Sequence, residues 1–209
     1  MGDNDNNLES IIIGCLGESS VGKTYLTRKY VHDNNVDFNI PTVGIEYFMI
    51  KKILSNGKKY KIKIYDTAGQ ERYKSLALNS IRHCEGVILM YDITNRKSFD
   101  SISEWTNNIY ELKDHDFPFI LIGNKCDLKD QREVSEEEGF EKAEKYKVTY
   151  YETSAKEGIN IEKPIDELLN NIIKKYEESI DRIKEKSNEK VNNINLAQKK
   201  NNKRKNKCC

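Results

Sequence analysis

A glycine-rich segment near the start of the chain carries residue types that bind phosphate. Residues 17–24 match the pattern G-x-x-x-x-G-K-[ST] and lie between an apolar run, 11–16, and a helix-like segment, 25–31. Glycines at both ends let backbone N–H groups turn toward phosphate oxygens, and the helix adds the positive end of its dipole. The predicted contacts are Gly17, Ser19, Ser20, Val21, Gly22, Lys23 and Thr24, with Lys23 on the β and γ phosphates and Thr24 on Mg²⁺.

A second polar segment, residues 66–71, reads Asp-Thr-Ala-Gly-Gln-Glu and follows a predicted strand. The Asp66 carboxylate can hold Mg²⁺ directly or through water, and Gly69 can bring its N–H to a γ-phosphate because no Cβ intervenes. Gln70 is placed to orient an attacking water, since its neutral amide both donates and accepts. An ordinary polar turn would explain Gly69 but not the whole hexapeptide.

A third motif carries residue types that can recognise the base of a nucleotide. Asn124-Lys125-Cys126-Asp127 follows the predicted strand 119–123, and a carboxylate at Asp127 can accept hydrogen bonds from N1–H and the exocyclic amine of guanine. Adenine would instead present a lone pair at N1. Lys125 can lay its methylenes on the base, and a backbone N–H near Ala155 can donate to the guanine oxygen. The predicted base contacts are Asn124, Lys125, Cys126, Asp127, Ser154, Ala155 and Lys156.

Alternating strand and helix patterns must position these motifs. Strands are predicted at 11–16, 46–54, 58–65, 87–91, 119–122 and 148–151, and helices at 25–31, 98–112, 135–146 and 162–176. Asn56-Gly57 predicts a hairpin between the second and third strands, and Ser135 with Glu138 forms a capping-box pattern. This order predicts an α/β fold with a doubly wound, mostly parallel sheet, one antiparallel edge strand, and ligands at the carboxyl ends of the strands.

Charge divides the chain into a body and a tail. Residues 176–209 hold ten Lys or Arg and five Asp or Glu, whereas residues 1–175 hold 25 and 29. No apolar run approaches the roughly 18 residues that cross a bilayer, and the acidic, Asn-rich start does not read as a signal peptide. The five cysteines lack metal-ligand spacing, so a reducing cytosol is expected. Residues 187–207 cannot build a packed core and are expected to be disordered apart from some helical extension.

Taken together, five segments resemble the guanine-nucleotide motifs of Ras-like small GTPases: residues 17–24, 41–42, 66–71, 124–127 and 154–156. Further segments resemble the Rab branch of this superfamily: residues 43–47, 65–71, 91–94 and the final cysteines. The resemblance implies a P-loop NTPase fold with a six-stranded sheet flanked by about five helices. It implies a catalytic set of Gln70, Lys23, Thr42 and Gly69, and Mg²⁺ held by Thr24, Thr42 and Asp66. Thr42 would belong to switch I and residues 67–80 to switch II, both ordered by GTP and released by hydrolysis to GDP.

The same resemblance divides the chain into a flexible N-terminus at 1–7, a GTP-binding domain at 8–177, a hypervariable, largely disordered basic tail at 178–207, and a prenylation site at 208–209. Lys199 to Lys207 contains six basic residues and no acid. Such a segment attracts anionic lipid, and prenyl groups on Cys208 and Cys209 would supply the second anchoring signal. The expected partners are an exchange factor, a GTPase-activating protein, a prenylation escort, a GDP-dissociation inhibitor and effectors. Nucleic acid is not an expected partner.

These expectations describe a GTP-hydrolysing, membrane-anchored switch in vesicle traffic, on the cytoplasmic face of an intracellular membrane and cycling with the cytosol. A second hypothesis is a protein that holds the nucleotide but hardly turns it over. It is motivated by Asn35 and Asn39, at positions where the family usually carries aromatic residues. A third hypothesis, a P-loop kinase or nucleic-acid ATPase, would need adenine selectivity, and residues 124–127 argue against it.

Overall fold

The computed structural model describes residues 8–33, 46–66 and 74–205, and for residues 33, 46, 74–76 and 186–205 it describes the backbone alone. By its internal contacts the chain divides into two units, residues 1–172 and residues 173–209. The first unit contains all of the strands, and the fold described below is that of this unit.

A six-stranded sheet forms the centre of the first unit, in the order β2-β3-β1-β4-β5-β6. The pairing of β2 with β3 is antiparallel, and the other pairings are parallel. This confirms the predicted mostly parallel sheet with one antiparallel edge strand. The strands are β1 Ser10–Leu16, β2 Glu46–Ile53, β3 Lys59–Asp66, β4 Gly86–Asp92, β5 Phe119–Asn124 and β6 Thr149–Thr153.

Burial along the strands follows from their side-chain pattern. Every residue of β4 and of β5 is buried, as expected for central strands covered on both faces. In β3 buried residues alternate with partly exposed ones, so one face of the hairpin is in contact with solvent. The hairpin turns at Gly57, whose positive φ of 75° suits glycine.

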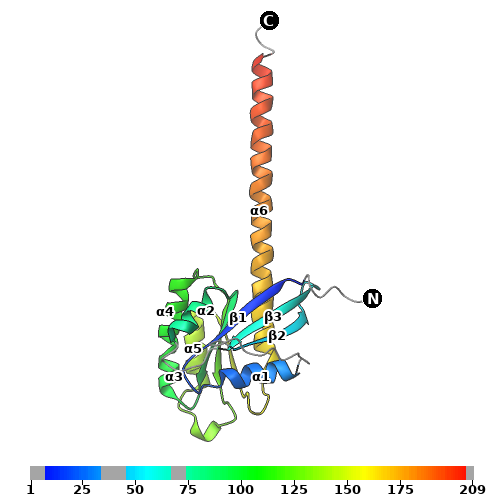
Figure 1. Ribbon diagram of the computed structural model, residues 1–209. Coiled ribbons are helices and arrows are strands. Elements are labelled where there is room, and N and C mark those ends of the chain that lie inside the picture. Colours follow the sequence, from blue (N-terminus) through cyan, green and yellow to red (C-terminus); the bar gives the residue numbers. More distant parts are fainter. Residues whose placement is uncertain (1–7, 34–45, 67–73, 206–209) are drawn as a thin grey trace, which may run out of the picture. The chain divides into compact units, whose positions relative to one another are not determined.

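Helices cover both faces of the sheet, as the predicted doubly wound fold requires (Figure 1). The helices are α1 Lys23–Asp33, α2 Lys74–Ile81, α3 Arg96–Asp100, α4 Ile102–Leu112, α5 Glu136–Tyr146 and α6 Glu162–Lys205, with a 3-10 turn at Lys129–Gln131. The predicted helix 98–112 is divided at Ser101 into α3 and α4, and the eight-residue α2 was not predicted as a helix. The predicted capping box of α5 is present: Ser135 accepts from the Glu138 N–H while Glu138 accepts from the Ser135 N–H.

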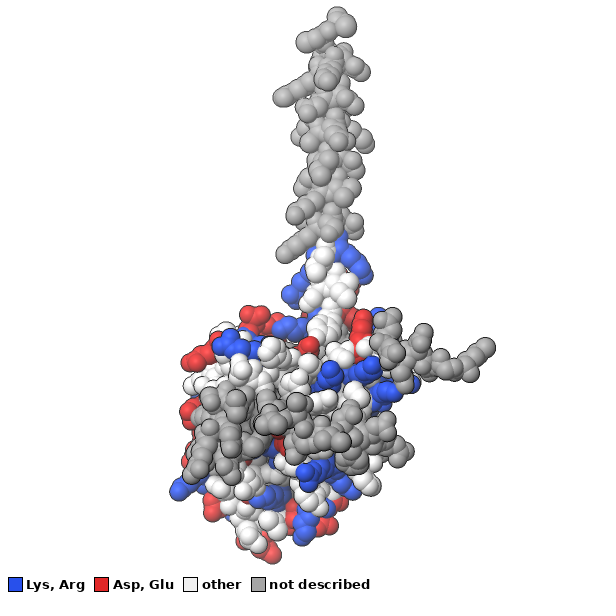
Figure 2. All heavy atoms as spheres, viewed as in Figure 1, with Lys and Arg blue, Asp and Glu red and all other residues white. Residues whose placement is uncertain are grey.

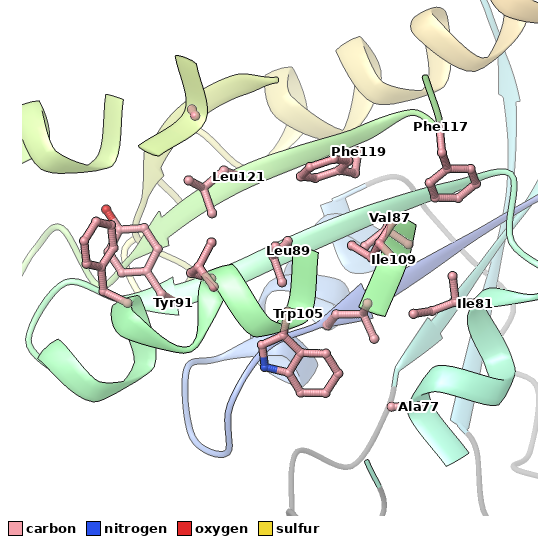
Figure 3. Close-up of a cluster of buried hydrophobic side chains, with 14 of the residues drawn as sticks. Ala77, Ile81, Val87, Leu89, Tyr91, Trp105, Ile109, Phe117, Phe119 and Leu121 are labelled. Atoms are coloured by element: carbon pink, nitrogen blue, oxygen red, sulfur yellow. The ribbon is translucent and has the colours of Figure 1, made fainter. Parts of the chain in front are cut away.

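A large apolar cluster fills the space between the sheet and helices α2, α4 and α5. Figure 3 shows Ala77 and Ile81 from α2 and Trp105 and Ile109 from α4 lying against the aromatic and aliphatic side chains of β4 and β5. On the opposite face, α1 and the first turns of α6 contact the sheet: Cys15 Sγ lies 3.5 Å from Thr27 Oγ1, and the side chains of α6 close over Gly86. The helices on the two faces therefore pack against one sheet, and its parallel strands β1, β3, β4, β5 and β6 have their carboxyl ends at the same edge.

Helix α6 is longer than predicted. Its apolar side chains Ile165, Leu168, Leu169 and Ile172 are buried, so this part of the helix closes the core of the first unit. The described backbone is helical through Lys205, so the helical extension expected within the basic tail reaches that residue. No Gly or Pro follows Pro164 to end the helix, and Lys, Glu, Gln and Ala are good helix formers. Pairs such as Arg182–Glu178 at 3.7 Å and Lys184–Asp181 at 3.1 Å add weak support.

The surface of the described residues is polar and of mixed sign. Figure 2 shows acidic and basic side chains interspersed over the described part of the visible face. None of the described helices combines the length and the apolarity that crossing a membrane would require.

Leu168 provides a test of the closing contact of α6. Its side chain is fully buried (0% exposed), and its Cδ1 lies 3.1 Å from the position of a Cβ on Gly86. Replacing Leu168 by Ala should lower the free energy of unfolding by about 2–5 kcal/mol, because apolar contacts are lost and a cavity remains. Ile180→Ala on the same helix, at a side chain 50% exposed, is the control and should change it by less than about 0.5 kcal/mol. Equal effects in urea unfolding would contradict this account.

Candidate nucleotide-binding site

The sequence motifs come together at one edge of the sheet. β1 ends at Leu16 before the glycine-rich loop, β3 ends at Asp66, β5 ends at Asn124 and β6 ends at Thr153. These are carboxyl ends of parallel strands, where open α/β sheets bind ligands. Segments more than a hundred residues apart in the chain are thereby brought into hydrogen-bonding contact, as described below.

The glycine-rich loop has a geometry that requires both of its glycines. Gly17 has φ +134° and Gly22 φ +105°, a region that side chains disfavour. A Cβ on Gly17 would lie 2.1 Å from the Met90 carbonyl oxygen, and a Cβ on Gly22 would lie 2.2 Å from Asn124 Nδ2. Ser20 also has a positive φ, 64°. The loop is therefore a tightly curled backbone that leads directly into α1, which suits the binding of phosphate.

Lys23, the first residue of α1, is only 4% exposed. Its ammonium donates to the main-chain oxygens of Gly17 at 2.9 Å and Glu18 at 2.7 Å. Burial lowers the pKa of Lys23, and nearby acidic groups, Asp66 among them, oppose this effect. A phosphate group in the loop would add negative charge beside this ammonium and favour its charged form.

Asn124 ties three segments together from a buried position. Its Nδ2 donates to the Val21 oxygen in the glycine-rich loop at 2.8 Å, and its Oδ1 accepts from Thr153 Oγ1 at 3.0 Å and from the Ala155 N–H at 3.1 Å. The residue predicted to contact the base thus holds the loops in place. The Ala155 N–H, predicted to donate to the guanine oxygen, is engaged with Asn124. Direct contacts of both residues with a base stay predictions.

The predicted base-reading residue Asp127 is oriented by its neighbour in space. Ser154 Oγ donates to Asp127 Oδ1 at 2.6 Å and in turn accepts from the Glu157 N–H at 3.0 Å. Lys125, with φ +69°, places its ammonium 2.6 Å from Asp92 Oδ2. The main chain adds a bond from the Cys126 N–H to the Thr153 oxygen at 3.0 Å. The two predicted base loops, 124–127 and 154–156, therefore form one connected unit.

Of the predicted magnesium ligands, Asp66 and Thr24 lie within the described residues. Asp66 is 5% exposed, and its charge acts on the pKa of both Lys23 and Cys15. The described residues contain no group of three or more His, Cys, Asp or Glu side chains that would hold a metal by themselves. A buried carboxylate and one hydroxyl beside a phosphate-binding loop fit an ion that is completed by phosphate oxygens and water.

Five predicted residues lie outside the described part of the chain: Thr42, Gly69, Gln70, Cys208 and Cys209. Their assigned roles stay predictions.

Sequence reasoning missed residues that support the site without belonging to its motifs. Trp105 in α4 donates from Nε1 to Glu18 Oε1 in the glycine-rich loop at 3.1 Å. Arg132 forms a bidentate ion pair with Glu152, in which NH1 donates to Oε1 at 2.5 Å and NH2 donates to Oε2 at 2.7 Å. No local pattern reveals these pairs, because their members are 87 and 20 positions apart. The single tryptophan was the one available hint.

This fold and site define a P-loop protein of the Ras-like type, and the comparisons agree. A family model described as "Ras family" matches residues 11–174, and the chain belongs to this family.

The relatives are of the Rab type. The chain is 40% identical over 166 residues to the human Ras-related protein Rab-3A, covering 79% of this chain and 75% of that protein. It is 42% identical over 160 residues to Rab-10 of Diplobatis ommata, covering 77% and 80%, and 40% identical over 179 residues to Rab-10 of Caenorhabditis elegans, covering 86% and 87%. It is a small GTPase of the Rab type, which hydrolyses GTP to GDP and functions in vesicle trafficking.

Gly22 offers a test of the loop geometry. Gly22→Ala should weaken the binding of GTP at least about tenfold, because the new methyl group would meet the Asn124 amide at 2.2 Å and disturb the loop. Gly57→Ala is the matched control: its φ is also positive, +75°, but nothing lies within 4 Å of the added carbon. Titration with a fluorescent GTP analogue should separate the two variants, and equal affinities would contradict the requirement for a bare backbone at Gly22.

Proposed function

We propose that this chain is a membrane-anchored molecular switch whose described loops 17–24, 124–127 and 154–156 bind a guanine nucleotide with Mg²⁺. The observation that carries the proposal is the Asn124 side chain, which joins the glycine-rich loop to both predicted base loops. Phosphate recognition and base recognition are therefore parts of one rigid constellation. A carboxylate at Asp127 suits guanine, because guanine presents two donors on one edge.

The chain's own residues divide the chemical work. Lys23 would move from its main-chain partners, the oxygens of Gly17 and Glu18, to the β and γ phosphates. Gln70 would hold the attacking water, and the Gly69 N–H would contact the γ-phosphate. The sequence places no arginine to act in cis, so turnover should be as slow as that of Ras alone, on the order of 10⁻⁴ to 10⁻³ s⁻¹, until a partner supplies one.

Thr24, Thr42 and Asp66 would hold Mg²⁺. The ion, when bound, neutralises phosphate charge and supplies a Lewis acid. Thr42 in switch I and Gly69 in switch II would connect the two switch segments to the γ-phosphate, so that hydrolysis removes the contact that orders them.

The tail supplies the proposed membrane anchor. Six basic residues at 199–207 would attract anionic lipid, at about 1 kcal/mol for each charge near the surface. Prenyl groups on Cys208 and Cys209 would make the attachment stable. The proposed partners are an exchange factor, a GTPase-activating protein, a prenylation escort, a GDP-dissociation inhibitor and effectors that read the switch segments. The proposed location is the cytoplasmic face of an intracellular membrane, in exchange with the cytosol.

Asp127→Asn tests base selection. The amide presents a donor where the carboxylate accepted, so preference should shift from GTP toward xanthosine triphosphate by at least about tenfold. The control is Asp130→Asn, the same change at an exposed residue three positions later. Competition binding against a labelled guanine nucleotide measures the shift. If the preference stays with GTP, Asp127 is not the base reader.

Gln70→Leu tests hydrolysis separately from binding. Loss of the amide should slow the release of phosphate in a single turnover by about tenfold or more while GTP affinity stays near that of the wild type. Gln131→Leu, at an exposed glutamine in the 3-10 turn, is the control and should leave both quantities unchanged. An unchanged rate in Gln70→Leu would remove the water-positioning role.

A further inference from the structure

A hydrogen-bonded chain of polar side chains, of which Tyr91 is fully buried and the others are partly buried, lies near the predicted base loops. The Tyr91 hydroxyl in β4 lies 2.8 Å from the Tyr150 hydroxyl in β6, and Tyr150 donates to Glu152 Oε1 at 3.1 Å. Arg132 holds the same carboxylate with NH1 at 2.5 Å and NH2 at 2.7 Å. Because Tyr150 donates to Glu152, its oxygen accepts from Tyr91, and the hydrogen bonds run in one direction from the sheet interior to the carboxylate.

Close packing holds this chain in place. A Cβ on Gly123 would lie 2.8 Å from the Tyr91 hydroxyl oxygen, and a Cβ on Gly139 would lie 2.4 Å from the Tyr150 hydroxyl oxygen. Both tyrosines therefore occupy space that only glycine leaves open in β5 and α5. Burial raises the pKa of each tyrosine, so both hydroxyls keep their protons and stay donors.

Two members of this hydrogen-bonded group, Arg132 and Glu152, are close in sequence to the two base loops. Arg132 lies five residues after Asp127, and its NH1 also donates to the Val134 oxygen at 3.0 Å. Glu152 lies two residues before Ser154, the side chain that orients Asp127. A two-pronged ion pair fixes distance and angle better than a single contact does. The pair therefore sets how far the segment after Asp127 stands from the end of β6.

Hydrogen bonds join the two base loops directly. They connect Asn124 with Thr153 and Ala155, the Cys126 N–H with the Thr153 oxygen, and Ser154 with Asp127. The Arg132–Glu152 pair adds a connection outside these, and Tyr150 stops the carboxylate of Glu152 from rotating toward solvent. A partly buried carboxylate that accepts from three donors has its orientation restricted.

We propose that Tyr150, Glu152 and Arg132 are positioning residues that set the residence time of the guanine base by holding Asp127 in register with the 154–156 loop. This inference rests on the proposed guanine site. Tyr150 and Arg132 lie outside the nucleotide motifs, and Glu152 lies two residues before the 154–156 loop. Tyr91 acts further back, by fixing the Tyr150 hydroxyl.

Tyr150→Phe tests the proposal with a change of one oxygen atom. The release of a fluorescent GDP analogue from the full chain should become about three- to tenfold faster, as expected for the loss of one partly buried hydrogen bond. The same measurement with the inosine analogue, which lacks the exocyclic amine, should show a smaller acceleration, because one of the two Asp127 contacts is already absent. Removal of Mg²⁺ by a chelator should accelerate release by the same factor in wild type and variant.

Tyr151→Phe is the matched control. The hydroxyl of this next residue along β6 also forms a hydrogen bond, but it donates to Glu167 in α6 and not to the base loops. This variant should release GDP at the wild-type rate. Thermal unfolding of both variants separates lost stability from lost positioning, since a merely structural hydroxyl would lower the melting temperature without changing the ratio of the GDP and inosine-nucleotide rates.

Arg132→Lys gives a second, independent readout. Lysine keeps the charge but cannot form the two-pronged pair, so the GDP release rate should fall between those of the wild type and Arg132→Gln. The proposal is overturned if Tyr150→Phe and Arg132→Gln fold but release GDP at the wild-type rate. It is also overturned if these variants accelerate the release of the GDP analogue and of the inosine analogue by the same factor. If the wild-type chain binds no guanine nucleotide at all, the proposed function itself fails, and the two failures are thereby distinguished.

Discussion

The rest of the site depends on the buried amide of Asn124. One side chain supplies a donor to the glycine-rich loop at Val21 and an acceptor to Thr153 and Ala155. The amide carries a donor and an acceptor on separate atoms, whereas a carboxylate of the same size lacks the donor and an aliphatic side chain lacks both. The same amide explains why Gly22 must lack a Cβ. A buried network of this kind is stabilising only when its members are satisfied together, so the three segments are held as one unit.

Much of this architecture could be predicted because its signals are local or ordered along the chain. The strand-to-helix context of residues 17–24, and the succession of motifs behind it, led to the sheet and to the edge where ligands bind. The proposed base contacts could be named from local motifs, whereas the residues that support them could not. Asn124 was predicted as a contact of the nucleotide, whereas the structure shows it bonding to protein, since the preference of an amide among several buried partners depends on three-dimensional proximity.

The differences between expectation and structure have physical causes as well. Residues 187–207 were expected to be disordered apart from some helical extension, because they lack apolar residues for a core. The described helix extends through Lys205, in a segment that contains good helix formers and no Gly or Pro to end it. The pairs Trp105–Glu18 and Arg132–Glu152 join distant positions, and only the folded sheet brings them together. Composition predicts whether a segment can be buried, and it does not predict which partner a polar side chain will find.

The placement of Lys23 shows how a charged side chain is held in the interior of the glycine-rich loop. Its buried ammonium is held by two main-chain oxygens of the loop it belongs to. Burial lowers the pKa of this group, and nearby acidic groups, Asp66 and Glu18 among them, oppose that effect. A phosphate that displaces the carbonyls would replace neutral partners by a charged one and strengthen the interaction. In the proposed nucleotide site, a phosphate group would therefore offset part of the cost of burying this ammonium.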